Sequence, residues 1–240
     1  MFSLLPLLLS PSFILIAAAV IPAVALLIFV YKQDKLEKES WALIGRLVLF
    51  GAISTLLAQL TESIGIALIG VLFAPGGKLY NLVLYFIVVG LSEEGFKYLI
   101  LKWRTWNDPE FNCRFDGVVY ATAVSLGFAL WENISYVISY GFSTAIVRAV
   151  TAVPGHACFG VFMGAFYGAA KQLSCNRDEA NSKQCRVLSV VIPVILHGTY
   201  DYIASGSSRT GEWLFILFIA VLFWFAYRTV KRLSDADTYL

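Results

Sequence analysis

The chain has 240 residues, of which 59% are hydrophobic and only 14% are charged. This composition excludes an ordinary soluble domain and indicates a polytopic membrane protein. The net charge of +2, with no basic stripe bearing interleaved aromatic residues, argues against a nucleic-acid partner. The cysteines form no CxxC pair, so we expect free thiols and neither zinc ligation nor disulfides. They are Cys113, Cys158, Cys175 and Cys185.

Seven apolar segments are long enough to cross a bilayer as helices, which takes about 20 residues each. They cover approximately residues 3–31, 42–73, 79–101, 116–140, 144–170, 187–204 and 212–230. The second is interrupted by polar residues, so it is either one long tilted helix or a helix followed by a re-entrant piece. The first has no positively charged region before it, which predicts a retained span and not a signal peptide.

Lys and Arg gather in alternate connections. They follow the first, third, fifth and seventh segments, at residues 32–38, 102–114, 171–186 and 228–232. The positive-inside rule therefore predicts an N-terminus outside and a C-terminus in the cytoplasm. We predict an all-α, polytopic transmembrane helix bundle of about seven spans in the cell membrane, forming a single integral membrane domain over 1–240.

The third segment carries Glu93 and Glu94 within an apolar stretch. A charge at the bilayer centre costs about 2.5 kcal/mol or more, so such acids usually face a polar cavity and have a function. Lys97 shares a helix face with Glu93, and Glu94 is turned about 100° away. We therefore expect one acid to be paired and the other free. A Glu–Lys pair that merely neutralises itself at the interface would leave Glu94 unexplained.

The fourth segment has a face of small residues that allows another helix to approach closely. These residues are Gly117, Ala121, Ser125 and Ala129. Asp116 begins the segment, and Glu132 and Asn133 lie beyond the small-residue face. Glu132 is either a functional acid or a polar contact to a neighbouring helix.

Both histidines of the chain lie in predicted spans. His156 precedes glycines at every fourth position, 160, 164 and 168, and His197 shares a helix face with Asp201. A membrane histidine often makes only a helix–helix hydrogen bond, but here a carboxylate can orient one ring. At about 1.5 Å per residue, the acids and histidines lie roughly 12 to 24 Å deep and can share one cavity. Such groups can activate water and stabilise an oxyanion.

In this order the motifs resemble the PrsW family of intramembrane proteases, which belongs with the CAAX prenyl proteases and their bacterial relatives. Four pieces, covering about half the chain, carry the resemblance. They are Glu93-Glu94-x-x-Lys97; Phe115-Asp116-Gly117 through Gly127-Phe128-Ala129 to Glu132-Asn133; His156 with Phe159; and His197-x-x-x-Asp201. Ala121 and Ser125 stand where the family pattern has glycine, and Asp201 stands where Asn is also expected.

The resemblance implies hydrolysis of a peptide bond in or beside the membrane, in a single-span regulatory protein such as an anti-sigma factor. It implies a catalytic core over about 79–204, with the single-span substrate and the lipid bilayer as partners. Glu93 would be the general base, with Glu94 also required. His156 would hold the water, and His197 with Asp201 would stabilise the oxyanion. Glu132 would be a further acid of the catalytic group, behind the reacting groups or as a ligand. The supporting residues would be Lys97, Asn133 and Asp116.

The main open question about the chemistry is whether the site binds a metal ion. Catalytic zinc needs three protein ligands and a position for water. His156, His197 and one of Glu93, Glu94 or Glu132 would suffice for Zn²⁺ or another divalent cation. However, there is no HExxH motif, and the positive charge of the nearby lysine disfavours a divalent cation. We therefore favour a glutamate-activated water with no cofactor.

Two other functions use the same residue types. A proton- or cation-coupled transporter would carry a relay of acids and histidines across the membrane. The lack of an inverted repeat and the clustering of the acids argue against it. A non-catalytic membrane scaffold could keep the fold, but the complete set of acids and histidines argues against a decayed enzyme.

Overall fold

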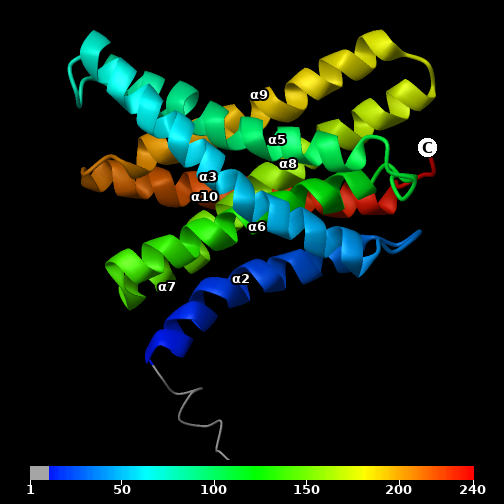
Figure 1. Ribbon diagram of the computed structural model, residues 1–240, viewed down its shortest axis with the longest axis horizontal. Coiled ribbons are helices and arrows are strands. Elements are labelled where there is room, and N and C mark those ends of the chain that lie inside the picture. The colour runs from blue at the N-terminus through cyan, green and yellow to red at the C-terminus, as the bar shows by residue number, and fades with distance from the viewer. Residues whose placement is uncertain (1–10) are drawn as a thin grey trace, which may run out of the picture.

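The computed structural model describes residues 11–240 of the chain, and within them it is a bundle of helices (Figure 1). The start of the predicted first span, at residue 3, lies outside the described residues. The all-α prediction is confirmed. The elements are α2 (Pro11–Gln33), α3 (Trp41–Leu72), α4 (Lys78–Leu82), the π-helix η1 (Val83–Gly90), α5 (Leu91–Thr105), α6 (Asp116–Tyr140), α7 (Phe142–Val150), α8 (Ala152–Cys175), α9 (Glu179–Ala204) and α10 (Arg209–Asp235).

Helix α6 is the centre of the bundle. Every residue from 115 to 129 is buried, and α2, α3, α5 and α8 all pack against the helix. Small side chains make this close packing possible. A Cβ atom added to Gly127 would overlap the backbone oxygen of Val48 in α3, and one added to Gly164 in α8 would overlap the backbone oxygen of Gly117. The predicted small-residue faces of α6 and α8 are thus in direct contact.

The outer surface of the bundle is apolar. Large hydrophobic side chains point outward along the helices, for example Val71 at 86% and Ile138 at 74% exposure. Such a surface would aggregate in water and suits contact with lipid. In the part of the chain that the structure describes, five helical stretches are long and apolar enough to cross a membrane: Ile16–Gln33, Trp41–Leu72, Phe142–Cys175, Glu179–Ala204 and Arg209–Asp235. The count of seven spans and their orientation stay predictions.

The ends of the helices differ from the predicted segments. The second segment is one continuous helix of 32 residues, α3, and contains no re-entrant piece. The fifth is divided at Thr151 into α7 and α8, and α9 begins at Glu179, well before the predicted 187. Hydropathy marks only the apolar part of a helix, whereas polar flanks stay helical where a cap supports them. Asp178 provides such a cap, since its carboxylate accepts from the backbone N–H of Asn181.

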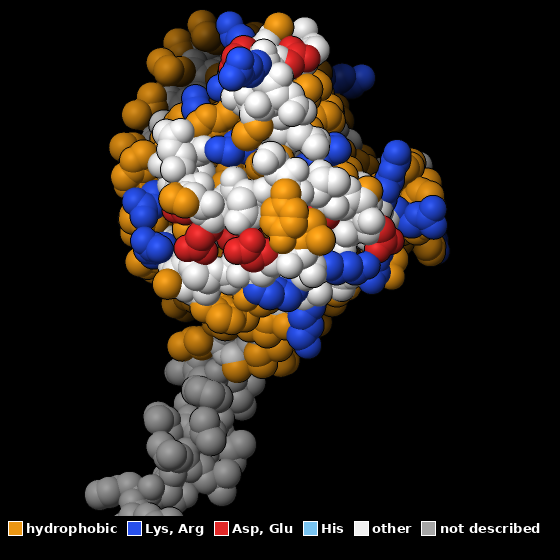
Figure 2. Space-filling view, turned by 90° about the vertical axis from the view of Figure 1, so that its right-hand side faces the viewer, with side chains coloured by type: hydrophobic (Ala, Val, Ile, Leu, Met, Phe, Trp, Pro, Cys, Tyr) orange, Lys and Arg blue, Asp and Glu red, His pale blue; other side chains and the backbone are white. Residues whose placement is uncertain are grey.

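The connections after α2, α5 and α8 and the end of α10 lie at one end of the bundle (Figure 1). Figure 2 looks onto this end and shows Lys and Arg side chains around it, with Asp and Glu side chains among them. These are the connections in which the sequence concentrates Lys and Arg. The arrangement supports the prediction that this end faces the cytoplasm.

Gly127→Ala tests the close packing of α6. The added methyl group has to displace the α3 backbone, so we expect a loss of about 1–3 kcal/mol in the free energy of unfolding. Gly45→Ala is the matched control, because nothing lies within 4 Å of the added atom. Thermal unfolding of the two purified variants in detergent gives the comparison. Equal stability would contradict the proposed contact.

The orientation is testable with one native and one introduced cysteine. Cys175, the last residue of α8, is exposed, whereas Cys113 and Cys158 are buried and unsuitable as reporters. With Cys185 replaced by Ala, a membrane-impermeant maleimide should label Cys175 only after permeabilisation. In a Cys175→Ala background, Ser207→Cys, between α9 and α10, should be labelled in intact cells. The reverse pattern would invert the predicted topology.

Candidate active site

Helix α5 places Glu93, Glu94 and Lys97 in the interior of the bundle. The Lys97 ammonium lies 2.8 Å from Glu94 Oε1 and 3.2 Å from Glu93 Oε2. Lys97 and Glu94 are completely buried, and Glu93 is 6% exposed. We expected Lys97 to pair with one acid and leave the other free, and this is wrong, because its flexible side chain reaches both carboxylates. Glu94 is the more tightly held of the two.

The π-helical segment η1 directly precedes α5 and brings the first turn of α5, which carries Glu93 and Glu94, against α9. A Cβ atom added to Gly90, the last residue of η1, would lie 3.2 Å from the backbone oxygen of Val194. A Cβ atom added to Gly198 in α9 would lie 2.6 Å from the ring of Phe86 in η1. The two glycines therefore let η1 and α9 approach closely. π-Helical turns inside α-helices are frequent at functional sites, where they change the direction of the following side chains.

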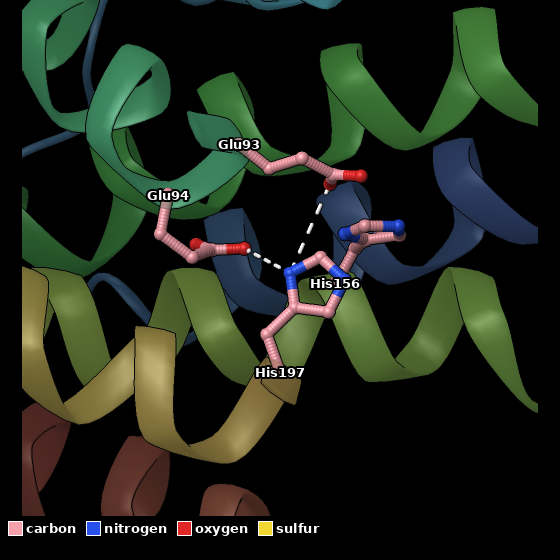
Figure 3. A group of neighbouring side chains, drawn as sticks. All are labelled: Glu93, Glu94, His156 and His197. Carbon is pink, nitrogen blue, oxygen red and sulfur yellow. Dashed lines mark hydrogen bonds and ion pairs between the residues drawn. The ribbon is translucent and has the colours of Figure 1, made fainter. Parts of the chain in front are cut away.

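His197 on α9 faces both acids of α5. Its Nδ1 lies 2.9 Å from Glu94 Oε1 and 3.8 Å from Glu93 Oε2 (Figure 3). Its Nε2 lies 3.4 Å from Asp201 Oδ2, one helical turn further along α9. The predicted pairing of His197 with Asp201 is present, and Glu94 makes the shorter contact. The ring is thus fixed from both sides.

His156 on α8 is held between Lys97 and Glu132. Its Nδ1 lies 3.1 Å from Lys97 Nζ, and its Nε2 lies 2.9 Å from Glu132 Oε2. A charged ammonium can only donate, so Nδ1 has to accept. The proton of a neutral ring is then on Nε2, which donates to Glu132. This contact connects α5, α6 and α8.

Glu132 has a second partner that the sequence did not reveal. Arg148 on α7 lies 3.0 Å from Glu132 Oε2, and its Nε donates to Asn133 Oδ1 at 3.1 Å. The Asn133 amide donates to the backbone oxygen of Ala19 in α2. Glu132 therefore holds helices together, as one of the two interpretations predicts, and its role as a functional acid stays a prediction. No spacing in the sequence relates Arg148 to these residues.

A cavity of about 290 Å³ adjoins the cluster. The titratable residues that line the cavity include Glu62, Glu93, Glu132, His156, His197 and Asp201. Glu94 and Lys97 do not line it. Glu62 comes from α3, and within residues 11–240 its Oε1 is buried and has no hydrogen-bond partner. In the sequence, Glu62 is one of the polar residues that interrupt the second apolar segment.

Asp116 is the one predicted supporting residue that the structure does not bring to this site. It is the first residue of α6, and Glu132 follows 16 positions later on the same helix. At 1.5 Å per residue the two are separated by about 24 Å. The Asp116 carboxylate instead accepts from the backbone N–H groups of Asn112 and Cys113.

Glu93, Glu94, His156 and His197 contribute donor atoms that lie within 4.8 Å of one another. Two imidazoles and two carboxylates are suitable ligands for zinc. However, the Lys97 ammonium lies 2.8 to 3.2 Å from donors on three of these residues. A cation is therefore already present among these residues, and a divalent ion bound between them would be strongly repelled by it. The donor types suit a metal, but their arrangement around Lys97 does not.

Comparison with known proteins gives one consistent result. The family model described as "PrsW family intramembrane metalloprotease" matches residues 39–227. The chain belongs to the PrsW family. It is 34% identical to Protease PrsW of Halalkalibacterium halodurans, over 94% of this chain and 99% of the relative. Protease PrsW of Geobacillus kaustophilus is 34% identical over 92% of each chain, and that of Bacillus subtilis is 32% identical over 94% and 98%. No solved structure matches the chain.

Membership of the PrsW family confirms the resemblance carried by the four motifs. The chain is an intramembrane protease of the cell membrane. A transporter and a non-catalytic scaffold are thereby set aside.

Proposed function

We propose that this PrsW protease cleaves a single-span regulatory membrane protein, of the anti-sigma-factor type, with a water molecule activated by Glu93. The main support is the unequal placement of the two adjacent acids. Glu93 lines the cavity, whereas Glu94 is buried behind it and is held by Lys97 and His197. A general base has to reach the water, and only Glu93 of this pair does so.

The reaction that fits these positions begins with a water molecule beside Glu93. Glu93 takes a proton from the water as the water oxygen adds to the carbonyl carbon of the scissile bond. The carbonyl oxygen becomes an oxyanion, which can accept from the Nε2–H group of His197 when the ring is protonated and its Nδ1–H donates to Glu94. Glu93 then gives its proton to the departing nitrogen as the carbon–nitrogen bond breaks. The products are a carboxylic acid and an amine.

Three further residues position these groups. Glu94 holds the ring of His197 through Nδ1, and Asp201 faces the other ring nitrogen. His156 uses Nδ1 for Lys97 and Nε2 for Glu132. Both nitrogens of His156 have a partner within 3.1 Å, whereas Nε2 of His197 lies 3.4 Å from Asp201. We therefore assign His156 to the support of Lys97 and Glu132, although the resemblance implies that it holds the water. We regard Glu94, His156 and Asp201 as positioning residues.

The catalytic proposal is tested by Glu93→Gln and His197→Ala. Loss of the base alone should lower the cleavage rate by about 10² to 10⁴. Proteomics of membranes should show a truncated single-span protein with the unmodified enzyme and the intact protein with either variant. Tyr80→Phe, outside the site, should cleave normally.

Cleavage by Glu93→Gln at the normal rate would remove Glu93 from the mechanism. If cleavage depends on Glu93 but the protein cut is not a single-span regulator, only the substrate assignment is wrong.

We also propose that the water is activated without a resident metal, because Lys97 supplies the positive charge between the donors. Purified active protein should contain metal well below one equivalent, and prolonged chelation should leave cleavage unchanged. Elemental analysis and a cleavage assay on the same sample measure both. Stoichiometric zinc that is required for cleavage, and restores it when returned, would make His156 and His197 ligands.

A further inference from the structure

A second cluster of acids lies at the end of the bundle that we predict to be cytoplasmic. Asp34 and Glu39 belong to the connection between α2 and α3, and Asp116 begins α6. One carboxylate oxygen from each lies within 4.8 Å of the other two. All three side chains are almost completely buried, with 1%, 3% and 0% exposure. None of them belongs to the proposed active site.

The cluster contains carboxylate oxygens that nothing in the described chain satisfies. Within residues 11–240, both oxygens of Asp34 and Oδ1 of Asp116 are buried and have no hydrogen-bond partner. A buried polar atom without a partner costs about 1–3 kcal/mol, and more if it is charged. Three such atoms in one place point to a bound ligand that satisfies them.

The surrounding contacts fix the acids without satisfying these oxygens. Asp116 Oδ2 accepts from the backbone N–H of Cys113 at 2.7 Å, and Glu39 accepts from the hydroxyl of Tyr120. The Lys38 ammonium is the nearby cation. It donates to the backbone oxygens of Tyr31 and Asp34, and no hydrogen bond joins it to a carboxylate of the cluster. Burial raises the pKa of Asp34 and Lys38 is close enough to offset part of that rise, but within residues 11–240 no ion pair joins a basic side chain to the three carboxylates.

We propose that Asp34, Glu39 and Asp116 bind a hard divalent cation, Mg²⁺ or Ca²⁺. All three ligands are carboxylates, which these ions prefer, and no imidazole belongs to the group. The bound ion would join the α2–α3 connection to the first residue of α6. Because α6 carries Glu132 beyond its buried middle, the ion would hold the central helix in place from a distance.

Protons compete with a cation for the carboxylate oxygens of the cluster. Burial raises the pKa of Asp34 to about 6 and that of Glu39 to about 7. An experiment therefore has to separate a bound ion from neutralised acids. Asp34→Asn does so, because its oxygens have no partner in the described chain and the substitution breaks no hydrogen bond. The substitution should lower the affinity if the acids bind a cation. It should instead remove a buried acid and stabilise the protein if the acids are neutralised by protons.

The experiment uses the purified full-length protein in detergent at neutral pH. Terbium luminescence should be sensitised by Tyr120, whose hydroxyl contacts Glu39, and Ca²⁺ or Mg²⁺ should displace the terbium. The same ion should raise the melting temperature of the protein. Asp34→Asn should lower the affinity on the order of tenfold or more. Glu37→Gln, an exposed acid of the same connection, is the matched control and should bind normally.

Glu93→Gln should also bind the ion normally, because the proposed site is separate from the catalytic cluster. Glu39→Gln is a second ligand variant in case Asp34→Asn does not accumulate. Competition by Mg²⁺ and Ca²⁺ separately decides between the two ions. The proposal is overturned if neither ion binds the unmodified protein or raises its melting temperature. It is overturned equally if Asp34→Asn and Glu39→Gln bind as well as Glu37→Gln.

Discussion

The site depends on one buried ammonium between two buried carboxylates. Desolvating a charge costs several kcal/mol even after relaxation, and removing one member of a buried pair typically costs about 3–5 kcal/mol. Lys97 lies 2.8 and 3.2 Å from the acids of its own helix and 3.1 Å from Nδ1 of His156. The acids, in turn, position His197 from α9. Three helices are therefore oriented around a single positive charge.

Close packing by small residues keeps this charge away from lipid and water. Gly117, Gly127 and Gly164 bring α6 into contact with α3 and α8. In the buried middle of α6, the ring centroid of Phe128 lies 4.0 Å from the Lys97 ammonium. In such a low-dielectric interior, hydrogen bonds and ion pairs are stronger, and an unpaired polar group is more costly. The same glycines that permit the fold thus strengthen the electrostatics of the site. Gly90 and Gly198 do the same between η1 and α9.

Much of this arrangement could be predicted from spacing along single helices. Helical periodicity predicted the small-residue faces, the His197–Asp201 pair and the Glu93–Lys97 pair. It failed where two helices meet, because no spacing relates Arg148 or Glu62 to the other residues of the site. Asp116 was grouped with the site through its motif, although the length of α6 separates it from Glu132. Helix ends were also missed, since hydropathy does not detect capped polar turns such as the one at Asp178.

The different positions of Glu93 and Glu94 follow from helix geometry. Neighbouring residues on a helix point about 100° apart, whereas residues three or four apart share a face. A lysine at position 97 can therefore reach both acids, even though they point in different directions. Glu94 points toward α9 and is fixed by His197, and Glu93 points toward the cavity. Adjacent acids followed by a lysine are a compact way to provide an anchored carboxylate and an accessible one from the same helical turn.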